Sequence, residues 1–250
     1  MVKPTGKGGI DYPDFIQATT PHSNPVEITR AELAIRLGWP QVFERTGNVL
    51  YYESFGYGLS DWNVSSNIAA NKPILASRGL LQSPYCARLT IDGTAAGYSD
   101  IAKHVGYPYI TSFGFEFSFM PTKEFGELYF GILLYTGEKK YSIWARYSDA
   151  TFIWSILDDT PAYIPVLTYD VGAWNTLVWH PVKMVVDLPN NRYARLMVDA
   201  QDVGLTQYVP KTDIDDTPPY LMMGIETFVV GTRKVNIYVD NVILTINEPI

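Results

Sequence analysis

The sequence is poor in cysteine and contains no long apolar run. Cys86 is the single cysteine among 250 residues, which excludes an intramolecular disulfide framework and a zinc site built on several cysteines. Cys86 lies in an apolar, strand-like stretch, which predicts a buried and unreactive thiol. No apolar run approaches the roughly 20 residues of a membrane-spanning helix, and the first residues lack the apolar segment of a signal peptide. We therefore predict no membrane insertion.

Positive charge is also scarce. The chain has 19 Lys and Arg against 26 Asp and Glu, a net charge of −7. Its basic residues form no cluster, and the densest groups are the pairs Lys139–Lys140 and Arg233–Lys234. An acidic chain without a basic patch is a poor partner for a phosphate backbone, so we predict no binding to nucleic acid.

No combination of residues in the sequence indicates catalysis, although a Ser-His-Asp triad assembled by the fold is not excluded by the sequence. The three histidines, His22, His104 and His180, show no metal-ligand spacing, and no glycine-rich phosphate loop occurs. Glu116 is the best-placed single carboxylate, but it has no acidic partner two or four residues away. A glycosidase needs two carboxylates, about 5 Å apart in retaining enzymes. The sequence thus predicts a protein that is not an enzyme, with no catalytic residue, no metal site and no cofactor.

The composition indicates an all-β protein with a substantial core. Apolar residues make up 47% of the chain and charged residues 18%, which excludes disorder of the whole chain. Aromatic residues reach 14%, led by 18 tyrosines, and aromatic side chains favour strands.

From residue 48 onward, strand-like stretches alternate with turn residues, and no helical pattern separates them. Many short strands in sequence predict an antiparallel β-sandwich or jelly roll. The expected strands are Val49–Phe55, Ile74–Arg78, Tyr85–Ile91, Tyr98–His104, Tyr109–Met120, Leu128–Tyr135, Lys140–Tyr147, Thr151–Leu157, Tyr163–Thr168, Thr176–Asp187, Arg192–Asp199, Gln201–Val209, Leu221–Val230 and Lys234–Ile246.

Two of these strands predict finer features. Four phenylalanines alternate with small or polar residues between Ser112 and Phe119, so one face is core and the other is expected on the open side of a sheet. The core face comprises Phe113, Phe115, Phe117 and Phe119, and the opposite face comprises Ser112, Gly114, Glu116 and Ser118. The turn Pro189–Asn191 is expected to join Lys183–Asp187 and Arg192–Val198 as a hairpin. Pro181 indicates a strand start, an edge or a bulge.

The first 47 residues differ from the rest of the chain. Residues 1–27 are rich in Gly, Pro, Thr and Asp without strand or helix periodicity, which indicates an extended arm. Residues 29–38 predict one short helix, because Thr29 and Glu32 form a capping box and Gly38 ends the pattern. We therefore divide the chain into an arm and helix (1–47), for assembly or docking, and a jelly-roll domain (48–250).

Three motifs resemble those of concanavalin A-like and carbohydrate-binding jelly rolls. An acidic-x-Phe strand, Glu53–Phe55, leads into a Gly-x-x-x-Trp turn, Gly58–Trp62. A small-residue turn then leads into a strand at Ser83–Leu89, and Val235–Val242 resembles the closing strand. These are motifs of fold rather than activity. They occur in sugar-binding modules, laminin-G-like adhesion domains and structural proteins of bacterial viruses, and the resemblance covers about residues 48–247.

The resemblance also implies a structural calcium ion between the first and last strands. The matching acidic residues are Glu53 and Asp240. Calcium takes six or more oxygen ligands, so ordinary hydrogen-bonded carboxylates are the alternative.

In domains of this kind, sugar rings stack on exposed tryptophan or tyrosine. The candidates are Trp62, Trp144, Trp154, Trp174 and Trp179. Trp144 and Trp154 lie in neighbouring expected strands beside apolar residues, which predicts core positions. Trp174 follows Gly172 in a loop-like context and is the predicted sugar-stacking residue.

Two functions remain open at this point. The arm and helix ahead of the jelly roll, an order that resembles some phage particle proteins, favour a non-enzymatic structural or assembly protein. It would decorate a virion surface as a homo-oligomer or as part of a larger lattice. The alternative is a carbohydrate-binding module or lectin that binds glycans through surface aromatics. Both predict a location in a virion or outside the cell, with no signal peptide in this chain.

Overall fold

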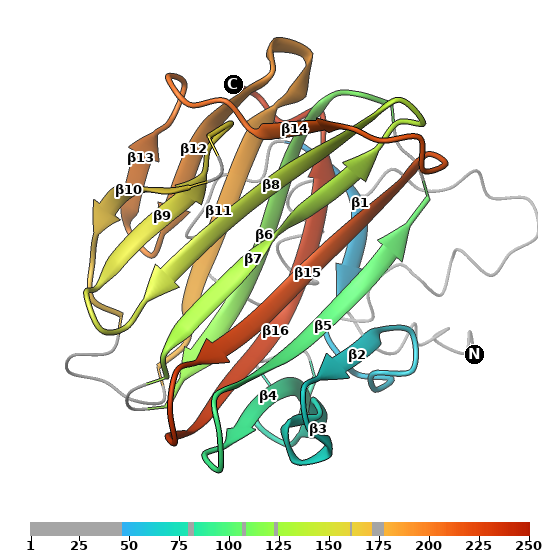
Figure 1. Cartoon of the computed structure of the whole chain (residues 1–250). Coiled ribbons are helices and arrows are strands. Elements are labelled where there is room, and N and C mark those ends of the chain that lie inside the picture. The colour runs from blue at the N-terminus through green and yellow to red at the C-terminus, as the bar shows by residue number, and fades with distance from the viewer. Residues whose placement is uncertain (1–46, 80–82, 107–108, 123–124, 161, 172–177) are drawn as a thin grey trace, which may run out of the picture.

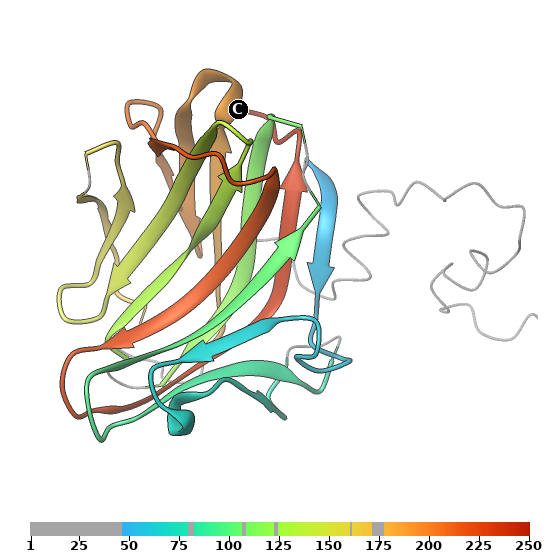
Figure 2. The same ribbon diagram turned by 45° about the vertical axis from the view of Figure 1, so that its right-hand side comes forward.

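A computed structural model describes residues 47–79, 83–106, 109–122, 125–160, 162–171 and 178–250, which form two antiparallel sheets stacked face to face (Figures 1 and 2). The predicted arm and helix, and Trp174, lie outside these residues. Within them, regular structure is strand apart from two short 3-10 turns, η2 (Ala69–Asn71) and η3 (Leu188–Asn190). No helix in the described part of the chain is long and apolar enough to span a membrane. The prediction of an all-β sandwich is confirmed.

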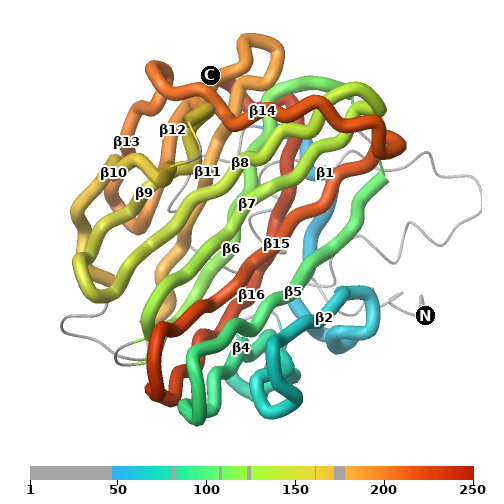
Figure 3. Tube along the Cα trace, in the orientation of Figure 1, coloured from blue at the N-terminus to red at the C-terminus, as the bar shows by residue number. Residues whose placement is uncertain are grey.

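Each sheet contains eight strands, and both are assembled from distant parts of the chain. In Figure 3, for example, β15 runs between β7 and β5. Sheet A has the order β13 (Gln201–Gly204), β12 (Arg192–Val198), β11 (His180–Asp187), β6 (Ser112–Pro121), β16 (Lys234–Ile246), β4 (Cys86–Asp92) and β3 (Ile74–Ala76), with β1 (Asn48–Glu53) also paired to β16. Sheet B has the order β10 (Tyr163–Thr168), β9 (Ile153–Leu157), β8 (Lys139–Ser148), β7 (Glu127–Tyr135), β15 (Tyr220–Val229), β5 (Gly97–Val105) and β2 (Asn63–Ser66), with β14 (Lys211–Ile214) also paired to β8.

Most of the predicted strands occur close to their expected positions. The hairpin of β11 and β12 forms as predicted, and Asn191 adopts the left-handed conformation at its turn, with φ 47°. Pro181 is the second residue of β11, which agrees with the predicted strand start. Strands β2 and β14 are not among the predicted elements, because each has four residues and few apolar side chains.

The core lies between the sheets and is dominated by aromatic rings. Phe113, Phe115, Phe117 and Phe119 are at most 1% exposed, as the alternation predicts. The ring of Phe117 meets that of Phe130 from sheet B edge to face, with 5.1 Å between centroids. Burying a phenylalanine side chain contributes roughly 1.5–3 kcal/mol to stability, so this face is a main source of folding energy.

Cys86 is buried as predicted. Burial raises the pKa of its thiol to about 12. Because the thiolate is the reactive form, Cys86 is an inert part of the fold.

The expectation that the second face of β6 lies open to solvent is wrong. Ser112, Gly114, Glu116 and Ser118 are all buried. Strand β6 is central in sheet A, and side chains from its neighbours cover it. A Cβ atom on Gly114 would lie within 3 Å of Thr245, Glu248 and Lys183. The strand's own alternation cannot reveal cover that comes from other parts of the chain.

Candidate ligand-binding site on the outer face of sheet B

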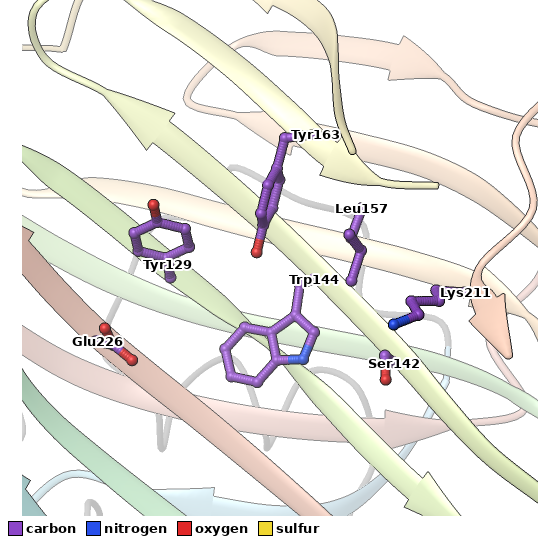
Figure 4. A pocket seen from close by; sticks show the side chains of 7 residues that line it. All are labelled: Tyr129, Ser142, Trp144, Leu157, Tyr163, Lys211 and Glu226. Carbon is purple, nitrogen blue, oxygen red and sulfur yellow. The ribbon is translucent and has the colours of Figure 1, made fainter. Parts of the chain in front are cut away.

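The outer face of sheet B carries an open cleft of about 350 Å³. This volume lies within the range of small-molecule sites in proteins. The cleft is lined by side chains from six strands: Tyr129 (β7), Ser142 and Trp144 (β8), Leu157 (β9), Tyr163 (β10), Lys211 (β14) and Glu226 (β15) (Figure 4).

The floor of the cleft is the indole of Trp144, which lies flat on two glycines. The register places Gly131 of β7 opposite Trp144 and Gly224 of β15 opposite Gly131. A Cβ atom on Gly131 would be 2.8 Å from Cδ2 of the indole, and one on Gly224 would be 3.2 Å from its Cη2. Side chains at either position would therefore push the ring off the sheet. Figure 4 shows the indole broadside to the viewer, as a ring lying along the sheet.

Two tyrosines extend this surface. The rings of Tyr129 and Tyr163 meet edge to face, with 5.7 Å between centroids and 72° between planes. In Figure 4, Tyr129 lies flat beside the indole while Tyr163 stands upright. The guanidinium of Arg146 lies 4.8 Å from the centre of the Tyr163 ring and 3.8 Å from the carboxylate of Glu127. Trp144 and Tyr129 thus form an aromatic floor, and Tyr163 forms a wall.

The tyrosine hydroxyls remain protonated at neutral pH. Burial, together with the neighbouring Glu127, raises the pKa of Tyr129, and burial raises that of Tyr163 to about 12. The Tyr129 hydroxyl donates a hydrogen bond to Glu127.

A buried tyrosine of the core holds the backbone of Trp144, the floor residue, by a hydrogen bond. The Tyr193 hydroxyl accepts a hydrogen bond from the backbone N–H of Trp144 at 3.3 Å and donates one to the carbonyl of Leu157 at 2.7 Å. Tyr193 belongs to β12 of sheet A and is fully buried. One side chain from the opposite sheet therefore bridges β8 and β9 directly beneath the floor.

An acidic pair flanks the cleft. Glu226 of β15 is directly opposite Asp100 of β5, so both carboxyls lie on the outer face. Burial and the nearby Asp100 raise the pKa of Glu226 to about 7. Burial also raises the pKa of Asp100, while a hydrogen bond from Ser65 acts in the opposite direction. Spacing within one strand predicts no paired carboxylates, and this pair forms across two strands, where such spacing carries no signal.

The tryptophan candidates differ in whether they lie in the core or on the surface. Trp154 and Trp62 are core residues, 0% and 5% exposed. Trp179 packs against a small cluster around Cys86. The expectation that Trp144 is core is wrong, because alternation in β8 turns it outward between the buried Ile143 and Ala145. Trp174, the predicted sugar-stacking residue, lies outside the described residues.

The residues named for calcium sit where the resemblance implies, on the paired strands β1 and β16. The carboxylate of Glu53 already accepts hydrogen bonds from the N–H of Phe55 at 2.6 Å, the Tyr51 hydroxyl at 3.2 Å and the Trp62 indole at 3.4 Å. The described residues contain no group of three or more His, Cys, Asp or Glu placed to hold a metal ion. The calcium ion stays a prediction, and the bonds around Glu53 favour the alternative of hydrogen-bonded carboxylates.

No protein-family model and no curated protein sequence matches the chain. Solved structures do match. The lectin UEA-II in complex with galactose is 12% identical, with a TM-score of 0.53, over 81% of this chain and all of that one. The carbohydrate recognition domain of Emp47p is 9% identical, with a TM-score of 0.52, over 82% of this chain and all of that one.

A phage protein also matches: the carbohydrate esterase vb_24B_21 of Shiga toxin-encoding bacteriophage phi24B. It is 11% identical, with a TM-score of 0.50, over 81% of this chain and all of that one. At such identities the likeness shows the fold alone. The chain has the concanavalin-like jelly-roll β-sandwich of lectin and carbohydrate-binding domains, as its sequence motifs predict.

Proposed function

We propose that this protein binds carbohydrate, without catalysing a reaction, in the cleft on the outer face of sheet B. The observation that carries the proposal is the Trp144 indole lying flat over Gly131 and Gly224. A ring held in this way turns one broad apolar face toward the cleft. A sugar ring also has an apolar face of C–H groups, so the two surfaces can stack and exclude water from each other.

The rim of the cleft supplies the polar part of such a site. Ser142, Lys211 and Glu226 line the cleft beside the aromatic floor. Small-molecule sites generally combine apolar walls with a few polar groups that fix orientation. Sugar hydroxyls both donate and accept hydrogen bonds, which matches this mixture. The solved structures named for galactose and carbohydrate recognition share the fold, which also supports the proposal.

Titration calorimetry against a panel of neutral oligosaccharides tests the proposal. We expect Trp144→Ala to weaken binding by about tenfold or more, as is typical when an aromatic anchor is truncated. Tyr57→Ala is the control, because Tyr57 is 101% exposed and is not part of the cleft. Binding that survives Trp144→Ala would overturn the proposal, and loss of binding in Trp174→Ala alone would return the site to the residue predicted from sequence.

A structural or assembly role in a virion or other particle stays a prediction. It depends on residues 1–46, which lie outside the described part of the chain. Such a role is compatible with sugar binding by the jelly roll, because the two would use different parts of the chain. Sedimentation of a chain lacking residues 1–27 tests it, since an unchanged assembly state would remove its main support.

A further inference from the structure

The second proposal rests on the first and specifies the ligand. We propose that the cleft selects a glycan that carries positive charge, an amino sugar with a free ammonium group, which binds to the paired carboxylates of Asp100 and Glu226.

The pair lies within reach of a sugar stacked on the floor. Glu226 lines the cleft, and its two cross-strand neighbours are Asp100 on one side and Tyr129 on the other. Directly opposed residues of an antiparallel pair have Cβ atoms about 4.5–5.5 Å apart. Glu226 is two residues along β15 from Gly224, which supports the Trp144 ring, a step of about 7 Å. A substituent on a ring stacked at Trp144 can therefore contact both carboxylates.

The pair lacks a positive partner of its own. Like charges directly opposite each other are destabilising, and no ion pair joins either carboxylate to a Lys or Arg in the described part of the chain. The Oδ1 atom of Asp100 is buried and has no hydrogen-bond partner among the described residues. An ammonium group brings three N–H donors and a positive charge. It can therefore donate a hydrogen bond to Oδ1 of Asp100 and offset the repulsion between the two carboxylates.

Each basic residue at the cleft already has an acidic neighbour. Arg146 lies against Glu127 and the Tyr163 ring. Lys211 lies 3.6 Å from Asp213, a carboxylate that it shares with Lys140 at 3.4 Å. Arg146 is held away from a ligand by these contacts, and the net charge of −7 opposes an acidic sugar. A divalent metal ion would need more oxygen ligands than two carboxyls supply. An organic cation is therefore the ligand class that fits.

Protonation of the pair should make the affinity for an amino sugar depend on pH. The groups that face Glu226 are Asp100, Tyr129 and Tyr163, with Ser65 beyond Asp100 and Arg146 beyond Tyr129. Burial places the pKa of Glu226 at about 7. Below that pH the carboxyl takes up a proton and no longer attracts an ammonium, while the amine of the sugar gains its positive charge. The contribution of Glu226 is therefore the difference between the wild type and Glu226→Gln, and this difference in affinity for an amino sugar should shrink as the pH drops from 7 to 5.

The experiment compares glucosamine oligosaccharides with their N-acetylated counterparts of equal length, by titration calorimetry at pH 7 and pH 5. For the wild-type chain at pH 7 we expect the amino form to bind about tenfold more tightly or better, as charge-assisted hydrogen bonds allow. Glu226→Gln and, independently, Asp100→Asn should bring the ratio of the two affinities close to one. Glu138→Gln is the control, because it removes the same charge from an exposed turn residue and should leave the ratio unchanged.

The outcomes separate the two proposals. Suppose that binding depends on Trp144 but the wild-type chain binds the amino and N-acetylated sugars equally well, or that Glu138→Gln lowers the ratio of these affinities as much as Glu226→Gln does. The selection of amino sugars is then overturned, and the carbohydrate site stands. If no oligosaccharide binds in a Trp144-dependent way, both proposals fail. Release of shorter sugars that stops in Glu226→Gln would show that the pair is catalytic and would overturn its role as a binding group.

Discussion

The hydroxyl of Tyr193 accepts a hydrogen bond from the backbone N–H of Trp144, although the two residues belong to opposite sheets of the sandwich. Pairing between β8 and β9 extends only from Ala145 onward along β8. At Trp144 the tyrosine takes the place of the missing strand partner, and it donates to Leu157 of β9 in turn. Tyr193 therefore holds the backbone of the floor residue in place from within the core.

Removing this hydroxyl should affect both stability and binding. In Tyr193→Phe, the N–H of Trp144 and the carbonyl of Leu157 each lose a partner inside the protein. Leaving a buried polar group unsatisfied costs about 1–3 kcal/mol, so we expect the free energy of unfolding to fall by about that amount and glycan affinity to weaken. Denaturant unfolding and calorimetry measure the two effects. Tyr57→Phe, which alters an exposed hydroxyl, is the control, and equal stability of both variants would show that the bridge contributes nothing.

The glycines beneath Trp144 give a graded test of the floor. A Cβ atom on Gly224 would press on the indole at 3.2 Å, so Gly224→Ala should tilt the ring, weaken binding and leave the fold nearly intact. A Cβ atom on Gly131 would also lie 2.1 Å from the backbone oxygen of Ile143. Because backbone cannot move aside cheaply, Gly131→Ala should reduce stability by at least about 1–3 kcal/mol.

Gly204→Ala is the matched control for both glycine variants, since nothing lies within 4 Å of its added Cβ atom. Thermal denaturation ranks the three alanine variants by stability, and glycan titration ranks them by affinity. If Gly224→Ala binds glycan as well as Gly204→Ala, the flat seat of the indole is irrelevant to binding.

The fold could be predicted from the sequence because its signal is local. Alternation in β6 identified the four core phenylalanines, and β10 and β16 have the bounds that their apolar patterns predict. Strands β2 and β14 escaped prediction because their pairing comes from neighbouring strands rather than from their own side chains.

The site could not be predicted because it depends on register between distant strands. Trp144 has apolar neighbours and so looks like a core residue. Alternation in β8 turns it outward, and its position opposite Gly131 shows that the ring lies flat on the sheet. In the same way, Asp100 and Glu226 form a pair only after β5 and β15 align. No spacing within either strand carries that information.

The acidic pair also makes a prediction about pH and stability. The raised pKa of Glu226 means that the folded chain keeps a proton up to about pH 7, whereas the unfolded carboxyl ionises near pH 4.5. The folded state therefore binds more protons in this window, and stability falls as the pH rises through it. Glu226→Gln removes the penalty, so the variant should match the wild type at pH 4.5 and exceed it at pH 8, by about 1–2 kcal/mol after solvent screening.

Denaturant unfolding at the two pH values checks this difference. Asp202→Asn is the control, because Asp202 is exposed on β13 and its replacement should give no such pH-dependent gain. A Glu226→Gln variant that is less stable than the wild type at pH 8 would show that the carboxylate is compensated by a partner.

Lys183 of β11 and Glu248, which follows β16, form a buried ion pair that covers the outer face of β6. The ammonium of Lys183 lies 2.7 Å from Oε1 of Glu248, and both side chains are 0% exposed. Thr245 donates to the same carboxylate oxygen, and the Ser112 hydroxyl donates to the Glu248 carbonyl at 2.5 Å. These bonds attach the segment that follows β16 to the middle of sheet A.

Replacing one residue of this ion pair should lower the free energy of unfolding far more than replacing both residues together. Lys183→Met leaves the Glu248 carboxylate buried without its cation, and Glu248→Gln removes the carboxylate that the ammonium contacts. Each loss of a buried partner costs about 3–5 kcal/mol, and Glu116, directly opposite Lys183, lowers the cost of the second change. The double variant retains neither charge, so it should recover a large part of the loss, because an apolar replacement of a buried pair is often close to neutral. A double-mutant cycle from denaturant unfolding measures the coupling between the two residues. If the losses in the single variants simply add in the double variant, the two charges do not stabilise each other and the segment after β16 is held by its remaining hydrogen bonds.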